Sequence, residues 1–233
     1  MSERKAIPLP GEPEGKPFHL PGESCIYMDE VCEFFDNKYP GREGFVYHEI
    51  VSDLVHLDVH ILYPTKDEPF FVVFTTGMSD LPMTMPEQMQ EEEKSEYERA
   101  ELYMLLPDTW NPKSESKTDT EMSEENYWAI RSIKSLARFP HDYKTWFGPW
   151  HTIANGADYE PPVEGSEMGG NIIASLGLEV NASDGALINL YMVMPASKAE
   201  VEFKLDRGIE ALLDVFEKHD VPFVIDIFRK SVI

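Results

Sequence analysis

The chain has 233 residues, enough for one large domain or two small ones and for a sizeable buried core. Its 43 acidic residues against 20 basic ones give a formal net charge of −23 at pH 7. Such a surface repels phosphate backbones, so it argues against direct nucleic-acid binding and favours basic protein partners. No apolar run reaches the ~20 residues that a membrane-spanning helix needs. The polar, proline-rich N-terminus lacks the apolar core of a signal peptide, which predicts a cytoplasmic protein.

The two cysteines, Cys25 and Cys32, are expected to be free thiols. In a helix over residues 25–38 they would share one face but lie about 10 Å apart along its axis. That separation is too long for an undistorted disulfide. Buried free thiols are typical of a reducing compartment.

The first half of the chain predicts one helix and four strands. Residues 1–22 are expected to form a flexible lead-in, and residues 23–233 a single domain. A helix is expected over 25–38, and Pro40-Gly41 stops it. Two strands, 45–51 and 54–63, are expected to be joined by a turn at Ser52 and Asp53. A continuous apolar strand over 69–76 and a strand over 99–106 follow. Residues 81–98 between the last two strands are expected to form a long loop with a solvated acidic run.

The second half predicts two helices and three strands. A polar loop is expected over 111–120, then a helix from Ser123 that ends at Pro140, and an irregular loop to about 169. Strands are expected over 171–180 and 186–195. A long helix over 198–220, in which Gly208 marks close packing or a break, is followed by a strand over 222–228. Strands come in clusters with helices between them, without regular βαβαβ alternation. The pattern predicts an α+β (mixed α/β) domain with a mixed sheet flanked by helices.

Three alternating polar residues form the first candidate site. On the strand expected over 54–63, His56, Asp58 and His60 would project from one face, with neighbours about 6.5 to 7 Å apart. Imidazole and carboxylate groups are competent zinc or iron ligands, but a spread of ~13 Å is awkward for one ion. Further ligands could come from the aromatic loop, at His141, Asp142 and His151. The alternative is an ordinary polar strand face, and no spacing-defined metal motif is present.

The turn Gly77-Met78-Ser79-Asp80-Leu81, which ends the strand over 69–76, is the second candidate. A nucleophilic Ser79 would need a base and an oxyanion hole, and GMSDL is not the GxSxG motif. The alternative is a structural corner, in which Gly77 turns the chain and Asp80 caps backbone amides or pairs with Arg99 or Arg138. The sequence has no phosphate-binding loop and no dinucleotide-binding glycine motif.

Five motifs follow one another along the chain, namely HLDVHILYP, TTGMSDLPM, ERAELYMLLP, ARFPHDYKTWF and WHTIANG. In this order they resemble the suppressor-of-fused (SUFU) domain family, whose motifs fall here at Asp58, Gly77 to Met83, Arg99 to Leu102, Leu136 to His141, and His151 to Gly156. The resemblance is strong over residues 45–162 and looser towards the C-terminus. One departure is Trp150, which stands where the family usually has a glycine. Tryptophan adopts a positive φ less readily than glycine.

The resemblance implies a mixed sheet flanked by helices, a binding role and no catalysis or cofactor. Animal members of the family hold a Hedgehog-pathway transcription factor in a complex. Bacterial single-domain members are associated with polymorphic toxin systems as immunity proteins, and the length of this chain makes them the closer analogues. We therefore expect an immunity-like protein that binds and neutralises a basic protein toxin, without nucleic-acid or membrane partners. The alternative is a metal-dependent enzyme that uses His56, Asp58 and His60 with His141 and His151.

Two segments are candidate contact surfaces for such a partner. One is the acidic run Glu91 to Glu98, which includes Glu92 and Glu93, although such a run is more often a solvated face. The other is the aromatic loop from Trp146 to His151, whose tryptophans could instead pack in the core. The remaining candidates are Asp58 and Asp80 for binding, and Gly77, Ser79, Arg99, Arg138, His141 and Gly156 as members of structural motifs.

Overall fold

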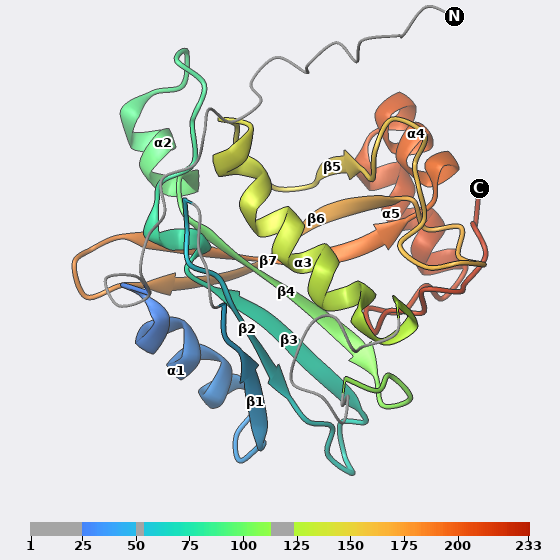
Figure 1. Ribbon diagram of the computed structural model, residues 1–233. Coiled ribbons are helices and arrows are strands. Elements are labelled where there is room, and N and C mark those ends of the chain that lie inside the picture. Colours follow the sequence, from blue (N-terminus) through green and yellow to red (C-terminus); the bar gives the residue numbers. More distant parts are fainter. Residues whose placement is uncertain (1–24, 50–53, 113–123) are drawn as a thin grey trace, which may run out of the picture.

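The computed structural model describes residues 25–49, 54–112 and 124–233 (Figure 1). The expected lead-in over residues 1–22, the turn at Ser52 and Asp53 and most of the polar loop over 111–120 lie outside the described residues. Among the described helices, none combines the length and the apolar character needed to cross a membrane.

A seven-stranded mixed sheet organises the described chain, with the strand order β1-β2-β3-β4-β7-β6-β5 (Figure 1). The strands are β1 (Gly44–Tyr47), β2 (Asp58–Leu62), β3 (Phe70–Thr76), β4 (Ala100–Pro107), β5 (His151–Ala154), β6 (Gly170–Asn181) and β7 (Leu187–Ala196). Every pair of neighbours is antiparallel except β4 and β7, which run parallel. The predicted α+β class with a mixed sheet is confirmed.

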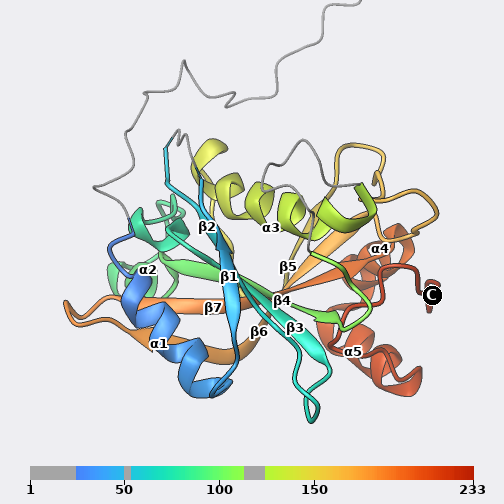
Figure 2. The ribbon, with the colours of Figure 1, turned by 60° about the horizontal axis from the view of Figure 1, so that its bottom comes forward.

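Helices cover both faces of this sheet (Figure 2). They are α1 (Met28–Lys38), the 3₁₀ turn η1 (Met78–Asp80), α2 (Glu91–Tyr97), α3 (Glu124–Asp142), α4 (Lys198–Arg207) and α5 (Ile209–Lys218). Helix α3 packs on one face, and α1, α4 and α5 pack on the other.

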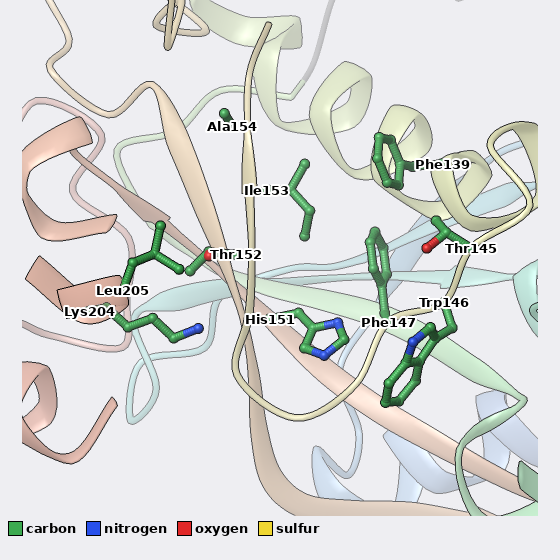
Figure 3. A pocket seen from close by; sticks show the side chains of 10 residues that line it. All are labelled: Phe139, Thr145, Trp146, Phe147, His151, Thr152, Ile153, Ala154, Lys204 and Leu205. Carbon is green, nitrogen blue, oxygen red and sulfur yellow. The ribbon is translucent and has the colours of Figure 1, made fainter. Parts of the chain in front are cut away.

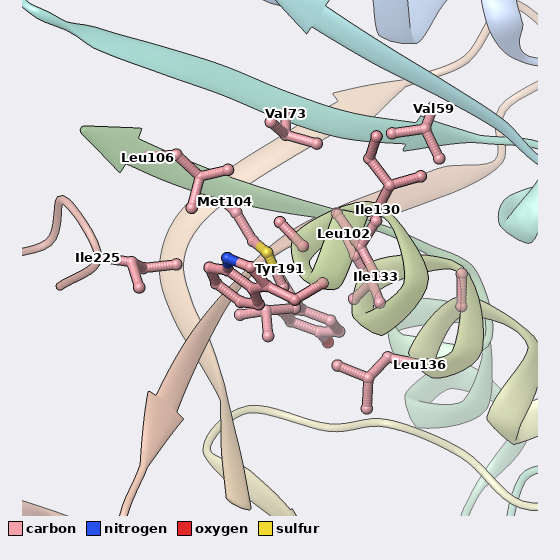
Figure 4. Close-up of a cluster of buried hydrophobic side chains, with 14 of the residues drawn as sticks. Val59, Val73, Leu102, Met104, Leu106, Ile130, Ile133, Leu136, Tyr191 and Ile225 are labelled. Atoms are coloured by element: carbon pink, nitrogen blue, oxygen red, sulfur yellow. The ribbon is translucent and has the colours of Figure 1, made fainter. Parts of the chain in front are cut away.

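Each covered face has its own apolar core. On the α3 face, Leu102 and Met104 of β4 meet Ile130 and Ile133 of α3 (Figure 4). On the other face, Phe35 of α1 stacks on Phe74 of β3, with ring centroids 4.0 Å apart. Strand β3 lies between the two cores, which explains why its sequence is a continuous apolar run.

The acidic segment contains a helix, although the sequence predicted a loop there. Helix α2 begins after Gln90, and Glu91, Glu92 and Glu93 occupy its first turn. Carboxylates at this end are favourable because the N-terminus of a helix carries partial positive charge. Lys94 adds an ion pair to Glu91 at 2.6 Å, one turn away.

Two predicted helix boundaries also differ from the structure. Pro140 lies inside α3, which continues to Asp142. Proline lacks only its own N–H donor, and the N–H of Tyr143 still donates to Phe139 O at 3.0 Å. The helix expected over 198–220 is two helices, separated at Gly208 with φ 87° and ψ 167°. Only glycine adopts that backbone conformation readily. Of the two alternatives predicted for Gly208, close packing or a break in the helix, the structure shows the break.

The remaining differences concern strands. The expected strand over 222–228 reduces to an isolated parallel bridge between Leu105 and Val224. The loop that was expected to be irregular contains the edge strand β5, which pairs with β6. Strand β2 begins at Asp58, so His56 precedes the strand instead of lying on it.

Candidate functional site

The corner after β3 is held by a close backbone contact. Gly77 has φ 101°, and a Cβ atom at this residue would lie 1.8 Å from the carbonyl oxygen of His56. Glycine is therefore required both by the backbone conformation and by the lack of space. The chain then forms η1, and His141 of α3 donates from Nε2 to the carbonyl oxygen of Met78 at 3.0 Å.

A buried carboxylate, Glu101 of β4, lies beneath the corner. One of its oxygens accepts from the backbone N–H and the hydroxyl of Ser79, at 2.9 and 2.7 Å. The other oxygen accepts from the hydroxyl of Thr75 at 2.6 Å. Burial raises the pKa of Glu101 to about 7, although these hydrogen bonds lower it. Because Ser79 is buried and donates to Glu101, its hydroxyl is not placed to attack a substrate.

Asp80 caps backbone amides, but those of a distant segment. Its carboxylate accepts from the N–H groups of Cys25 and Ile26, the latter at 2.9 Å, and so fixes the chain just before α1. Burial raises the pKa of Asp80, while these N–H groups lower it. Arg99 donates to the carbonyl oxygens of Ser79 and Asp80, at 2.6 and 3.1 Å. Arg138 forms an ion pair with Glu49.

The structure brings together only part of the predicted metal cluster. His56 Nε2 and Asp58 Oδ1 are 3.3 Å apart, whereas the ring of His60 is engaged elsewhere. His60 contacts Thr76 Oγ1 at 2.9 Å and Cys32 Sγ at 3.8 Å, and burial lowers its pKa to about 4. His141 lies at the corner, Asp142 ends α3, and His151 lies on β5. The alternative enzyme site therefore does not assemble among the described residues, where the group of potential metal ligands is Cys25, His56 and Asp58.

An open apolar pocket of about 500 Å³ lies beside β5 (Figure 3). Its lining residues come from the end of α3, the following loop, β5 and α4, and they are Phe139, Thr145, Trp146, Phe147, His151, Thr152, Ile153, Ala154, Lys204 and Leu205. A second hollow of about 560 Å³ shares Phe139, Ile153 and Ala154 with it and reaches Gly156. Because they share these three residues, the two hollows are neighbours along β5, and we call them together the β5 groove.

The two tryptophans of the aromatic loop have different positions. Trp146 lines the β5 groove and contacts the His151 ring, with centroids 4.7 Å apart. Trp150 packs against the core on the other face of the sheet. It has φ 65°, so this tryptophan adopts the left-handed backbone conformation that glycine adopts most readily. In the groove, burial and the nearby Lys204 lower the pKa of His151 and favour its neutral form.

Helix α2 adjoins the β5 groove. Tyr97 at the end of α2 contacts Trp146, with ring centroids 6.2 Å apart. Met83 and Thr84, which precede α2, link its end to the aromatic loop: the N–H of Met83 donates to Glu98 O at 2.7 Å, and the N–H of Thr84 donates to Thr145 O at 3.0 Å. The exposed side chains of Glu91, Glu92 and Glu93 thus stand on the helix next to the aromatic wall of the groove.

A helix-covered mixed sheet, with an apolar groove that adjoins an acidic helix, defines an α+β domain suited to binding. A family model for the suppressor of fused protein (SUFU) matches residues 53–230, and the chain belongs to this family. The family is one of non-catalytic binding domains. A search of curated proteins finds no match.

Solved structures share this fold at low sequence identity. A protein described as a SUFU homologue from Neisseria gonorrhoeae is 15% identical, with a TM-score of 0.63, and the match covers 89% of this chain and 97% of that one. The Sufu–Fu complex is 10% identical, with a TM-score of 0.59 and coverage of 90% and 93%. Drosophila Suppressor of Fused is 12% identical, with a TM-score of 0.57, and this chain covers 52% of its length.

Proposed function

We propose that this chain is an immunity-like SUFU protein that binds a basic protein toxin and neutralises it without catalysis. The observation that carries the proposal is the contact of Tyr97 with Trp146, which places α2 beside the β5 groove. Protein interfaces commonly combine an apolar centre that holds aromatic anchors with a charged rim. A homologue solved as the Sufu–Fu complex supports a protein partner, and the net charge of −23 supports a basic one.

The two parts of this surface have different roles in the proposal. The carboxylates of α2 steer a basic partner and raise its association rate, an effect that salt screens. The β5 groove receives an apolar side chain of the partner against Trp146 and Phe139. Neutralisation then follows because the bound chain covers the active site of the toxin or the surface beside it.

The experiment is a pull-down from lysate of the source organism at low and high salt, with bound proteins identified by mass spectrometry. We expect one basic partner that is released at high salt. The activity of that partner is then measured with and without the chain, and neutralisation requires that the chain abolish it. An acidic partner, or a basic partner with unchanged activity in the complex, would contradict the proposal.

Two variants locate the surface. Reversal of charge at Glu91, Glu92 and Glu93 to lysine should weaken capture at least about tenfold, mainly through slower association. The control reverses three exposed carboxylates of α5, at Glu210, Asp214 and Glu217, and changes the net charge equally. Equal losses in both variants would show that the overall charge, and not α2, attracts the partner. Trp146→Ala should increase the dissociation rate in the same assay.

A further inference from the structure

Three side chains that are typical zinc ligands meet between the segment before α1 and the segment before β2. The ligand atoms of Cys25, His56 and Asp58 all lie within 4.8 Å of one another. The corner after β3 brings them together. Asp80 accepts a hydrogen bond from the backbone N–H of Cys25, and Gly77, which has no side chain, leaves room for the carbonyl group of His56. None of the contacts derived above for partner binding uses this cluster.

The spacing of the cluster approaches that of a tetrahedral site. Two ligands about 2.0 to 2.1 Å from a tetrahedral zinc ion lie about 3.3 Å from each other. His56 Nε2 and Asp58 Oδ1 are 3.3 Å apart. A zinc–sulfur distance of about 2.3 Å would put Cys25 Sγ about 3.6 Å from these atoms. The ligand atoms of the three residues already lie within 4.8 Å of one another.

The surroundings orient the carboxylate and favour a cation. Asp58 is buried, its Oδ1 accepts from the N–H of Glu49 at 3.1 Å, and its Oδ2 lies 3.0 Å from His48 Nδ1. Such outer hydrogen bonds hold metal ligands in position. Burial and the negative charges of Asp58, Asp80 and Glu101 raise the pKa of the Cys25 thiol to about 12. A bound cation would offset this charge and stabilise the thiolate. Cys25 itself has φ 76°, a conformation that residues other than glycine rarely adopt outside functional or strained positions.

We propose that Cys25, His56 and Asp58 bind one zinc ion, with a water molecule as the fourth ligand. A thiolate combined with an imidazole selects zinc over magnesium or calcium, which prefer oxygen ligands. On binding, the thiol of Cys25 releases its proton to solvent and no redox change occurs. The ion would join the start of α1 to the start of β2 and so stabilise the folded chain. This inference goes beyond the proposed binding function and does not depend on it.

The test is a titration of the metal-free, untagged full chain with Co²⁺ alone, followed by displacement with Zn²⁺. We expect one equivalent of Co²⁺ to bind, with the near-ultraviolet charge-transfer absorption of a cobalt–thiolate bond. Cys25→Ser should lose this absorption. Cys32→Ser is the matched control, because Cys32 also contacts a histidine ring, with Sγ 3.8 Å from His60 Nδ1, and it should keep the absorption.

Thermal unfolding with and without Zn²⁺ supplies a second readout. Zinc should raise the Tm of the unaltered chain and of Cys32→Ser, since a ligand that binds only the folded state stabilises it. His56→Ala and Asp58→Asn should bind at least about tenfold more weakly. The proposal is overturned if binding is not stoichiometric, if Cys25→Ser keeps the thiolate absorption, or if only Cys32→Ser loses it. If Cys25→Ser does not fold, His56→Ala and Asp58→Asn decide by the same two readouts.

Discussion

At the scale of single residues, Glu101 links stability to pH. Its pKa is about 7 in the folded chain, raised by burial from an ordinary value of 4.5. A raised acid pKa means that the folded state holds its proton more tightly than the unfolded state. The stabilising contribution is therefore complete below about pH 4.5 and is lost as the pH rises through about 7. We expect this group alone to lower the free energy of unfolding by on the order of 3 kcal/mol over that range.

Urea denaturation at a series of pH values checks this expectation, with Glu101→Gln as the reference variant. Glutamine keeps the shape, accepts from Ser79 and donates towards Thr75, but carries no titrating proton. The difference in unfolding free energy between the two chains should change between about pH 4.5 and about pH 7, in favour of the glutamine variant at high pH. A constant difference would show that Glu101 does not titrate in this range.

Gly77 is required by space as well as by its backbone conformation. Gly41 has a similarly positive φ, 73° against 101° for Gly77, but a Cβ atom at Gly41 would meet nothing within 4 Å. Gly41→Ala should therefore cost only about 1 kcal/mol for the left-handed conformation. Gly77→Ala should cost more than about 3 kcal/mol, because the new atom would clash with the backbone of His56. Chemical denaturation of the two variants measures both losses of unfolding free energy. Equal losses would show that the close approach of His56 to Gly77 has no effect on stability.

The residues of the corner were predictable from the sequence as a motif, but their partners were not. Asp80 was expected to cap backbone amides, and nothing local indicates that these belong to Cys25 and Ile26. Glu101 was not singled out, although a lone carboxylate in the apolar strand AELYMLLP was a usable signal. Contacts between residues far apart in the chain depend on the packing of the whole sheet.

At the scale of elements, the N-terminus of α4 provides a test of local capping. The hydroxyl of Ser197 accepts from the N–H of Glu200 at 3.1 Å, and the carboxylate of Glu200 accepts from the N–H of Ser197 at 2.9 Å. Ser197→Ala should lower the free energy of unfolding by about 1 kcal/mol. Gln90→Ala is the control, because Gln90 precedes α2 without a side-chain cap and should cost much less. Ser231→Ala is a second control, because the Ser197 hydroxyl also contacts Ser231 Oγ at 2.7 Å. Tm measurements on the three variants separate the cap from this contact and from a general effect of alanine.

Element types were predictable where the apolar pattern, continuous or alternating, was strong. The apolar run at 69–76 and the strand pair over 171–195 correspond to β3, β6 and β7. Prediction failed where tertiary contacts or charge decide the structure. The acidic run forms α2 through favourable charges in its first turn, whereas the apolar stretch over 222–228 stays irregular apart from one bridge to β4. The β5 groove was equally difficult to predict, because its walls include Phe139 of α3 and Lys204 of α4, which are 65 positions apart in the chain.

At the scale of the whole molecule, the net charge of −23 predicts a salt effect on stability. Self-repulsion of a highly charged chain destabilises its compact state, and salt shortens the range of that repulsion to about 10 Å at 0.1 M. Added sodium chloride should therefore raise the free energy of unfolding at pH 7. Near the isoelectric point, at pH ≈ 4.5, the same salt should have little effect. Urea denaturation under the four conditions tests this, and an equal response at both pH values would exclude self-repulsion as the cause.

The parallel pairing of β4 with β7 also sets an order for synthesis on the ribosome. Ala100 pairs with Asn189, so the two partners are 89 positions apart in the chain. Strands β1 to β4 form a meander of local antiparallel pairs that can assemble early. Until β7 emerges, however, β4 is an open strand edge with apolar side chains on both faces, a state prone to pairing with other chains. The nascent protein is thus most exposed to aggregation between the completion of β4 and the arrival of β7, which is when protection by a chaperone would matter most.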